Sequence, residues 1–178
     1  RENMRIPVVN DLDELTLQKL SYNTVLIASP DSTHLDYLRY FASKNHVQNI
    51  ICEKPITTLS DSIQDELSNY IKSKNIYLNL SRRFSLDHAP LMDIKSLQTE
   101  SSFTIIVNYS KGILHNGIHA IDLLISALDC DFNILKTGEI VDYTMQDPTV
   151  SAVLWNNDIR ICLNGFNNNN FSIFEIDI

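Results

Sequence analysis

The segment Asn49-Ile50-Ile51-Cys52-Glu53-Lys54-Pro55 joins a short apolar run to a charged end that a proline closes. Apolar, β-branched runs of this length are typical of strands buried on both faces. Pro55 lacks an N–H group and cannot continue a hydrogen-bonded ladder. The segment therefore predicts a central strand that carries Glu53 and Lys54 at its carboxyl end.

The neighbouring segments alternate between strands and helices. Pro30 ends a β-branched run, and Asp31-Ser32-Thr33 then supplies N-cap candidates for a helix. We expect strands at 24–29, 49–52 and 76–80, and helices at 34–43 and, after a capping region at 57–60, at 63–74. Strands and helices in alternation, with short connections, favour a parallel sheet with right-handed crossovers. Ligands bind at the carboxyl ends of such strands.

The second half of the chain has a different pattern. Short strand-like runs alternate with asparagine-rich breaks at 156–158 and 167–170, which are typical of turns. We expect strands at 102–110, 134–143, 149–155, 158–163 and 171–178, and a helix at 119–128. This is an α+β pattern with an antiparallel sheet. The domain boundary is expected between Arg83 and Gln98, which divides the chain into domains at 1–84 and 85–178.

Composition and charge exclude several classes of protein. The chain has 178 residues, 44% of them hydrophobic, and no apolar stretch near the roughly 20 residues that a membrane helix needs. The net charge is −8 and the basic residues are scattered, which argues against a nucleic-acid partner. Three widely spaced cysteines show neither metal-ligand spacing nor a disulfide framework, which fits a reducing cytoplasm. We therefore expect a cytoplasmic protein with no metal and no membrane partner.

Three segments, in this order, resemble the glucose–fructose oxidoreductase / inositol dehydrogenase / rhizopine catabolism (Gfo/Idh/MocA) family. The run 25–34 is similar to a family strand that ends in a Pro–x–x–x–His turn, and Glu53-Lys54-Pro55 is similar to the family's Glu-Lys-Pro signature. The run 112–122 is similar to its Gly–x–His–x–x–Asp helix start. The resemblance implies a partial Rossmann-like dinucleotide-binding domain at 1–84, and a partial α+β substrate and oligomerisation domain at 85–178. Singly, Glu-Lys-Pro is a weak signal, whereas the ordered set is specific.

The resemblance also implies an activity and a set of site residues. The activity is that of an NAD- or NADP-dependent dehydrogenase acting on a secondary alcohol of a sugar, polyol or nucleotide-linked sugar. Lys54 and His119 are the expected catalytic residues. The cofactor would lie along Ser29, Pro30, His34, Glu53, Lys54 and Pro55, and the small-molecule carbohydrate would meet Lys54, Arg83, His115, Asn116 and His119.

Lysine and histidine suit the chemistry of alcohol oxidation. A base takes the hydroxyl proton while hydride leaves the same carbon, and a lysine serves if burial or a neighbouring cation lowers its pKa. Histidine shuttles a proton or binds a hydroxyl at physiological pH. Asp122, three residues after His119, either orients the imidazole or interacts only with the helix N-terminus.

Other residues leave alternatives open. Family members commonly carry an aspartate where this chain has His115, and His115 and His119 also have a spacing that suits a metal, although no third ligand is apparent. Two roles are open for Arg83: it binds a phosphate or carboxylate of the cofactor or substrate, or it forms a surface salt bridge. If Lys54 has no catalytic role, it is a solvated residue at a strand end. In the same way, His34 would be a helix residue and His119 a core residue, each without a chemical role.

The four glycines all lie at or after Gly112, so a G-x-G-x-x-G phosphate cradle is absent from the sequence. This observation supports a second reading, in which the chain is a fragment or a degenerate relative that binds a ligand or partner without turnover. A parallel sheet without its first strand and helix exposes apolar surface, so we expect a homo-oligomer.

Overall fold

The computed structural model describes residue 12 and residues 22–57, 64–85, 91, 94, 102–142, 147–156, 159–167 and 172–178. Several sequence predictions lie outside these residues. They are the capping positions 58–60, the helix start at 63, most of the expected domain boundary, and parts of the turns at 156–158 and 167–170. The boundary after residue 84 therefore stays a prediction.

The first sheet has three parallel strands in the order β1-β2-β3, as the alternating pattern predicts. Its elements are β1 (Thr24–Ile27), the 3₁₀ turn η1 (Asp31–Thr33), α2 (His34–Ala42), β2 (Asn49–Glu53), α3 (Gln64–Ser73) and β3 (Asn75–Asn79). Each strand lies within one or two residues of its predicted range. The connections are helical, as crossovers between parallel strands require.

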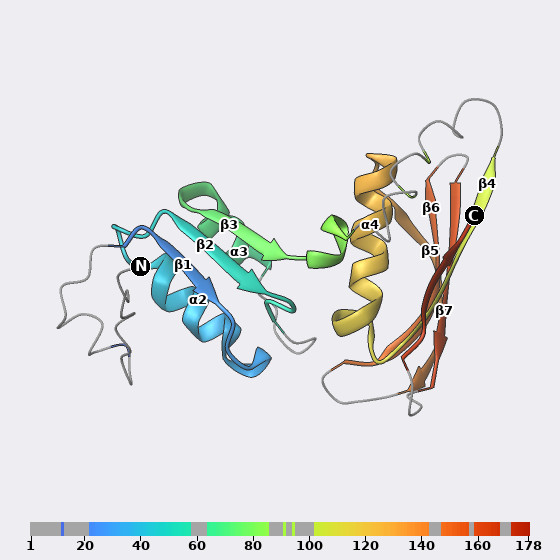
Figure 1. Cartoon of the computed structure of the whole chain (residues 1–178), viewed down its shortest axis with the longest axis horizontal. Coiled ribbons are helices and arrows are strands. Elements are labelled where there is room, and N and C mark those ends of the chain that lie inside the picture. The colour runs from blue at the N-terminus through green and yellow to red at the C-terminus, as the bar shows by residue number, and fades with distance from the viewer. Residues whose placement is uncertain are drawn as a thin grey trace, which may run out of the picture.

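Strand alternation gives this sheet one covered and one open face. Ile50 and Cys52 of β2 are fully buried, in one core cluster with Leu38 of α2. Leu26 and Tyr77 belong to the opposite set of positions and are 62% and 56% exposed. Side chains of α2 and α3 both contribute to this cluster, so both helices lie on the covered face of the blue-to-green sheet (Figure 1). The carboxyl ends of all three strands point toward the second half of the molecule.

The second sheet has five strands in the order β5-β6-β7-β4-β8. The strands are β4 (Phe103–Ser110), β5 (Asn133–Asp142), β6 (Thr149–Asn156), β7 (Ile159–Phe166) and β8 (Phe174–Asp177). Three of its pairings are antiparallel, as expected, but β4 and β7 run parallel. A helix lies between β4 and β7 in the chain, and a long connection of this kind allows a parallel pairing.

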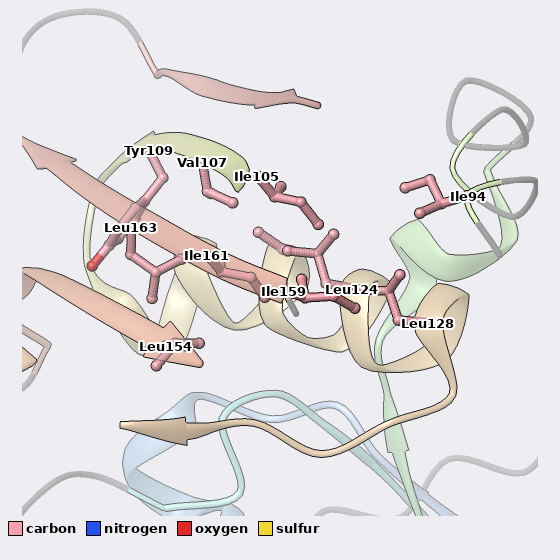
Figure 2. Close-up of a cluster of buried hydrophobic side chains, with 11 residues drawn as sticks. Ile94, Ile105, Val107, Tyr109, Leu124, Leu128, Leu154, Ile159, Ile161 and Leu163 are labelled. Atoms are coloured by element: carbon pink, nitrogen blue, oxygen red, sulfur yellow. The ribbon is translucent and has the colours of Figure 1, made fainter. Parts of the chain in front are cut away.

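The main core lies between the second sheet and α4 (Ile118–Leu128). Leu124 and Leu128 of this helix are 0% and 2% exposed and face Ile105 of β4 and Ile161 of β7, both fully buried (Figure 2). The apolar residues of α4 recur at helical spacing, so a single face meets the sheet. The helix is therefore fixed along its length, and its first turn is held in place by the core.

The two sheets meet through α4. The 3₁₀ turn η2 (Ser81–Phe84) follows β3 and contacts α4, which lies between η2 and the five-stranded sheet (Figure 1). The expected fold class is confirmed: a parallel, Rossmann-like α/β sheet followed by an α+β unit. Across the part of the chain that the structure describes, no helix is long and apolar enough to cross a membrane.

Candidate active site at the carboxyl edge of the parallel sheet

The carboxyl ends of the three parallel strands form one edge, and the start of α4 lies against it. Ser29 and Pro30 follow β1, Lys54 and Pro55 follow β2, and η2 follows β3. Lys54 Nζ donates a hydrogen bond to the backbone carbonyl of His115 at 3.0 Å. This contact joins residues 61 positions apart. It brings the expected catalytic lysine to the segment that carries the expected catalytic histidine.

His34, the first residue of α2, links the ends of β1 and β2. Its ring nitrogens Nδ1 and Nε2 each lie 2.7 Å from a carbonyl oxygen, of Pro55 and Ser29 respectively. The side chain is only 2% exposed, and both ring nitrogens face backbone. His34 therefore fixes the backbone that carries Ser29 and Pro55. Its expected contact with a cofactor stays a prediction.

Glu53 lies at the last position of β2, directly opposite Asn79 of β3. Its Oε1 atom accepts a hydrogen bond from Asn79 Nδ2 at 2.5 Å. Ser29 Oγ accepts one from the Thr33 hydroxyl at 2.8 Å, and the carbonyl of Pro30 accepts from the same hydroxyl at 2.7 Å. The polar groups expected along a cofactor thus lie at one edge and are held by neighbours.

The chain enters α4 through a tight turn, the π-helical segment Ile113–Gly117. Gly112 precedes it with φ 84° and ψ 151°, a conformation that is essentially restricted to glycine. The carboxylate of Asp147 lies where a side chain at Gly112 would project. This carboxylate accepts hydrogen bonds from the backbone N–H groups of Leu114 and His115, at 2.7 and 2.9 Å. Glycine here permits the close approach that anchors the turn.

His115 lies between two carboxylates. Its Nδ1 is 2.5 Å from Asp147 Oδ2, and its Nε2 is 2.7 Å from Asp31 Oδ2. The pKa of the Asp31 carboxyl is held below its ordinary value by a hydrogen bond from the backbone N–H of Asp31 and by the nearby His115 ring. Burial acts in the opposite direction. Both ring nitrogens of His115 are therefore engaged within the chain. Its expected contact with substrate hydroxyls stays a prediction.

Asn116 is 5% exposed and is bonded to backbone. Its Nδ2 group donates to the carbonyl oxygens of Ser110 and Ile173, each at 2.9 Å. These bonds tie the π-helical turn to the end of β4 and to the residue before β8. In this arrangement the side-chain amide serves the fold, and the expected role of Asn116 in substrate binding stays a prediction.

His119 is buried in a positively charged environment. Its side chain is 6% exposed, and its Nδ1 atom is buried with no hydrogen-bond partner among the described residues. Burial, followed by the charges of Arg82 and Lys54, lowers its pKa to about 4, whereas Asp122 and Glu53 act in the opposite direction. The ring is therefore neutral near pH 7. A buried neutral imidazole with an unpaired nitrogen is unusual in a pure core position.

The arginines of η2 are also engaged. Arg83 makes a two-pronged ion pair with Asp122, in which Nε lies 3.0 Å from Oδ2 and Nη2 contacts Oδ1. Asp122 thus pairs with Arg83, and the expectation that it orients the His119 ring is not supported. Arg82 lies over the ring of Phe174, 3.9 Å from its centroid. The salt-bridge alternative describes Arg83 in this structure.

The sequence patterns gave Asp147 and Arg82 no specific role in the site, and they assigned Asp31 only to a helix cap. Asp147 lies 32 positions from His115 and belongs to no recognisable motif. The π-helical turn was also not expected. The start of a helix leaves backbone N–H groups without a partner inside the helix, and this general rule does not show which residue supplies the acceptor.

The described residues suit the nicotinamide half of a dinucleotide better than a metal. Among the residues with known placement, no group of three or more His, Cys, Asp or Glu side chains could hold a metal ion. The strand-end edge instead offers a hydroxyl at Ser29, a carboxylate at Glu53 and an ammonium at Lys54, beside the unpaired His119 nitrogen. These groups fit a polar ring with a carboxamide and a neighbouring ribose.

Comparison with known proteins finds a similarity in the first part of the chain. The family described as "Oxidoreductase family, NAD-binding Rossmann fold" (GFO_IDH_MocA) matches residues 1–79. No curated protein matches the sequence.

Solved structures agree with the fold. Apo scyllo-inositol dehydrogenase from Lactobacillus casei has a TM-score of 0.67 at 18% identity, over 94% of this chain and 56% of its own. Myo-inositol 2-dehydrogenase from Lactobacillus plantarum has a TM-score of 0.69 at 15% identity, over 94% and 57%. The WlbA (WbpB) dehydrogenase from Thermus thermophilus, solved with NAD and α-ketoglutarate, has 0.59 at 17% identity, over 87% and 54%. The chain thus spans little more than half the length of these structures.

Proposed function

We propose that the chain, whose residues 1–79 match the family described as "Oxidoreductase family, NAD-binding Rossmann fold", forms the catalytic region of a nicotinamide-dependent dehydrogenase. The proposed substrate is a secondary alcohol of a sugar, polyol or nucleotide-linked sugar. The similar structures include two inositol dehydrogenases, which supports a polyhydroxylated substrate.

One observation carries this proposal: His119 is buried and neutral, and its Nδ1 has no partner among the described residues. An unpaired buried nitrogen costs roughly 1–3 kcal/mol, so a fold retains it where a ligand supplies the missing group. A substrate hydroxyl is such a group, because it donates a hydrogen bond to a neutral imidazole. Burial, followed by the charges of Arg82 and Lys54, lowers the pKa of His119 and keeps the ring able to accept.

Lys54 and His119 would divide the proton transfer. A bound nicotinamide would supply the acceptor for the hydride that leaves the alcohol carbon. The hydroxyl proton passes to a base, and the oxygen becomes a carbonyl oxygen. Lys54, oriented by the His115 carbonyl, would lie over the reacting hydroxyl as proton acceptor or as a positive charge that stabilises the developing alkoxide. His119 would then relay the proton away.

The remaining residues would shape the site. Glu53 and Ser29 lie at the strand ends where a ribose hydroxyl or the carboxamide would be held, and Pro30 and Pro55 would give those ends a fixed backbone. His34 would act on the cofactor through this backbone. Arg83, His115 and Asn116 would fix the turn and α4 through their bonds within the chain, and their expected contacts with the substrate stay predictions.

The test is oxidation of a panel of polyols, sugars and nucleotide-linked sugars with NAD⁺ and NADP⁺, followed by the absorbance of the reduced cofactor. We expect turnover with at least one polyhydroxylated alcohol. Lys54→Ala should lower kcat by roughly 10²–10⁴-fold, the usual contribution of a proton-transfer group. Lys72→Ala, at an exposed lysine of α3, removes the same charge and should leave the rate unchanged.

A ligand-binding module without turnover is the second candidate, and the observation that favours it is the absence of glycine before Gly112. A pyrophosphate normally rests on a glycine-rich turn at a helix N-terminus. In that case the reduced cofactor would not accumulate with any alcohol. If no alcohol is oxidised but the chain still binds the nicotinamide cofactor, the binding module is favoured over the enzyme.

A further inference from the structure

One imidazole joins the two sheets of the molecule. His115 Nε2 lies 2.7 Å from the carboxylate of Asp31, which follows β1, and its Nδ1 lies 2.5 Å from that of Asp147, which precedes β6. A neutral imidazole carries one N–H donor and an imidazolium carries two. The ring therefore donates to both carboxylates only in its protonated form. The three side chains make a polar link between the parallel sheet and the five-stranded sheet.

Asp147 also fixes the backbone of the same turn. It is 6% exposed, and its two oxygens accept the N–H groups of Leu114 and His115. The first N–H groups of a helix have no partner within the helix, so a buried carboxylate at this position satisfies donors that would otherwise be unpaired. The position of the His115 backbone thus depends on Asp147.

Lys54 depends in turn on that backbone. Its ammonium donates to the His115 carbonyl oxygen at 3.0 Å. A lysine ammonium sits on a flexible four-carbon stem, and its position is set by the acceptor that it finds. We infer that Asp31 and Asp147 are positioning residues, which hold His115 from both sides so that its carbonyl oxygen fixes the Lys54 ammonium in the site. Their catalytic meaning rests on the proposed function, whereas the placement of the ammonium can be measured without cofactor.

Thr149 offers a matched control for this inference. It is 1% exposed, and its hydroxyl accepts a hydrogen bond from the N–H of Gly112 at 2.9 Å. Thr149→Val therefore removes a buried side-chain acceptor from the same turn while the His115 ring keeps both carboxylates. If the turn were loosened in general, Thr149→Val and a substitution of Asp147 or Asp31 would have the same effect. Loss of the Lys54 contact alone is expected only when Asp147 or Asp31 is replaced.

The experiment records the lysine ammonium signals of the full chain by ¹H–¹⁵N NMR, with the Lys54 signal assigned by its absence in Lys54→Ala. Asp147→Asn and Asp31→Asn should each remove the hydrogen-bonded Lys54 signal, and Thr149→Val should keep it. Thermal unfolding of each variant shows that it is folded at the temperature used. Asp31 is about half exposed, so Asp31→Asn tests the inference even if Asp147→Asn does not fold.

A second readout applies if the protein turns over an alcohol. Asp147→Asn should lower kcat by on the order of 10²-fold with KM nearly unchanged, because a displaced catalytic group affects the chemical step more than binding. An unchanged Lys54 signal in Asp31→Asn would overturn the inference. Loss of the Lys54 signal in Thr149→Val, to the same extent as in the aspartate variants, would also overturn it. A wild-type chain that shows the Lys54 signal but binds neither NADH nor NADPH contradicts the proposed function alone.

Discussion

The imidazole of His119 is buried beside two cations, Arg82 and Lys54, and both effects disfavour its charged form. Its role therefore depends on its surroundings as much as on its place in a sequence motif. His115, four residues earlier, differs in its contacts, because both of its ring nitrogens lie within hydrogen-bond distance of a carboxylate. Two histidines of one segment thus have different chemistry, and spacing alone did not distinguish them.

The pKa of His119 provides a first prediction. A histidine NMR titration should give a midpoint near 4 for His119, well below the ordinary value of 6.5. Lys54→Ala should raise this pKa, because it removes a repelling charge, and Lys72→Ala should not change it. The assignment follows from the signal that His119→Asn removes. A wild-type midpoint near 6.5 would contradict the buried, cation-flanked environment.

The same shift predicts how stability depends on pH. The folded pKa lies below the unfolded value of 6.5, so the unfolded state binds more protons between these values. The contribution of His119 to stability is therefore complete above about pH 6.5 and is lost as the pH falls toward 4, by at most about 1.4 kcal/mol for each pH unit. Urea unfolding across this range should show a smaller slope in His119→Asn than in the wild type.

Gly112 is a residue at which any side chain should be costly. Its φ of 84° is strained for other residues, and the Asp147 carboxylate occupies the space of a Cβ atom. Gly112→Ala should destabilise the chain by roughly 2–5 kcal/mol, from strain and from a disturbed hydrogen-bonded carboxylate. Lys111→Gly is the control, because Lys111 also has a positive φ, of 63°, and glycine relieves it. Equal destabilisation by both changes would contradict this account.

At the scale of elements, the spacing of hydrophobic residues predicts the individual strands and helices. The run 49–52 becomes β2 (Asn49–Glu53), and the expected helix at 119–128 becomes α4 (Ile118–Leu128). The parallel pairing of β4 and β7 was not predicted, because alternation in one strand does not show the direction of its partner. The strand expected at 158–163 extends to Phe166 in the structure, three residues beyond its predicted end.

The candidate site was predictable to a similar extent. Motifs placed Glu53, Lys54 and His119 at one edge, because strand ends and helix starts have local signals. The contacts of Asp31 and Asp147 with His115 span 84 and 32 positions and arise only from the docking of two sheets. Patterns in a single sequence do not show which residues, far apart along the chain, come into contact.

Packing of α4 against the five-stranded sheet gives a prediction at this scale. Leu124 is fully buried in the main core, whereas the neighbouring Ile125 is 37% exposed. Leu124→Ala should lower the free energy of unfolding by roughly 2–5 kcal/mol, through lost burial and the cavity left behind. Ile125→Ala, which removes a similar volume, should cost less than about 1.5 kcal/mol. Similar costs for both, in urea unfolding, would mean that α4 is packed differently.

At the scale of the whole molecule, an open sheet face indicates association. Leu26, Ile51 and Tyr77 are aligned across the parallel sheet, and Leu26 and Tyr77 are largely exposed. Exposed apolar rows of this kind favour contact with another surface. We expect the chain to sediment above its monomer mass of 20.3 kDa at high concentration. Leu26→Glu should reduce this association, and Asn45→Glu, on the loop after α2, should not. A monomer at all concentrations would contradict the prediction.

The proposed nicotinamide site is tested most directly by titrating the 178-residue chain with NADH and NADPH and following the fluorescence of the reduced nicotinamide. We predict saturable binding that Lys54→Ala weakens and Lys72→Ala leaves unchanged, because Lys54 lies at the strand-end edge beside His119. Binding that is equally strong in Lys54→Ala, or absent up to millimolar cofactor, would contradict the placement of the nicotinamide at this edge.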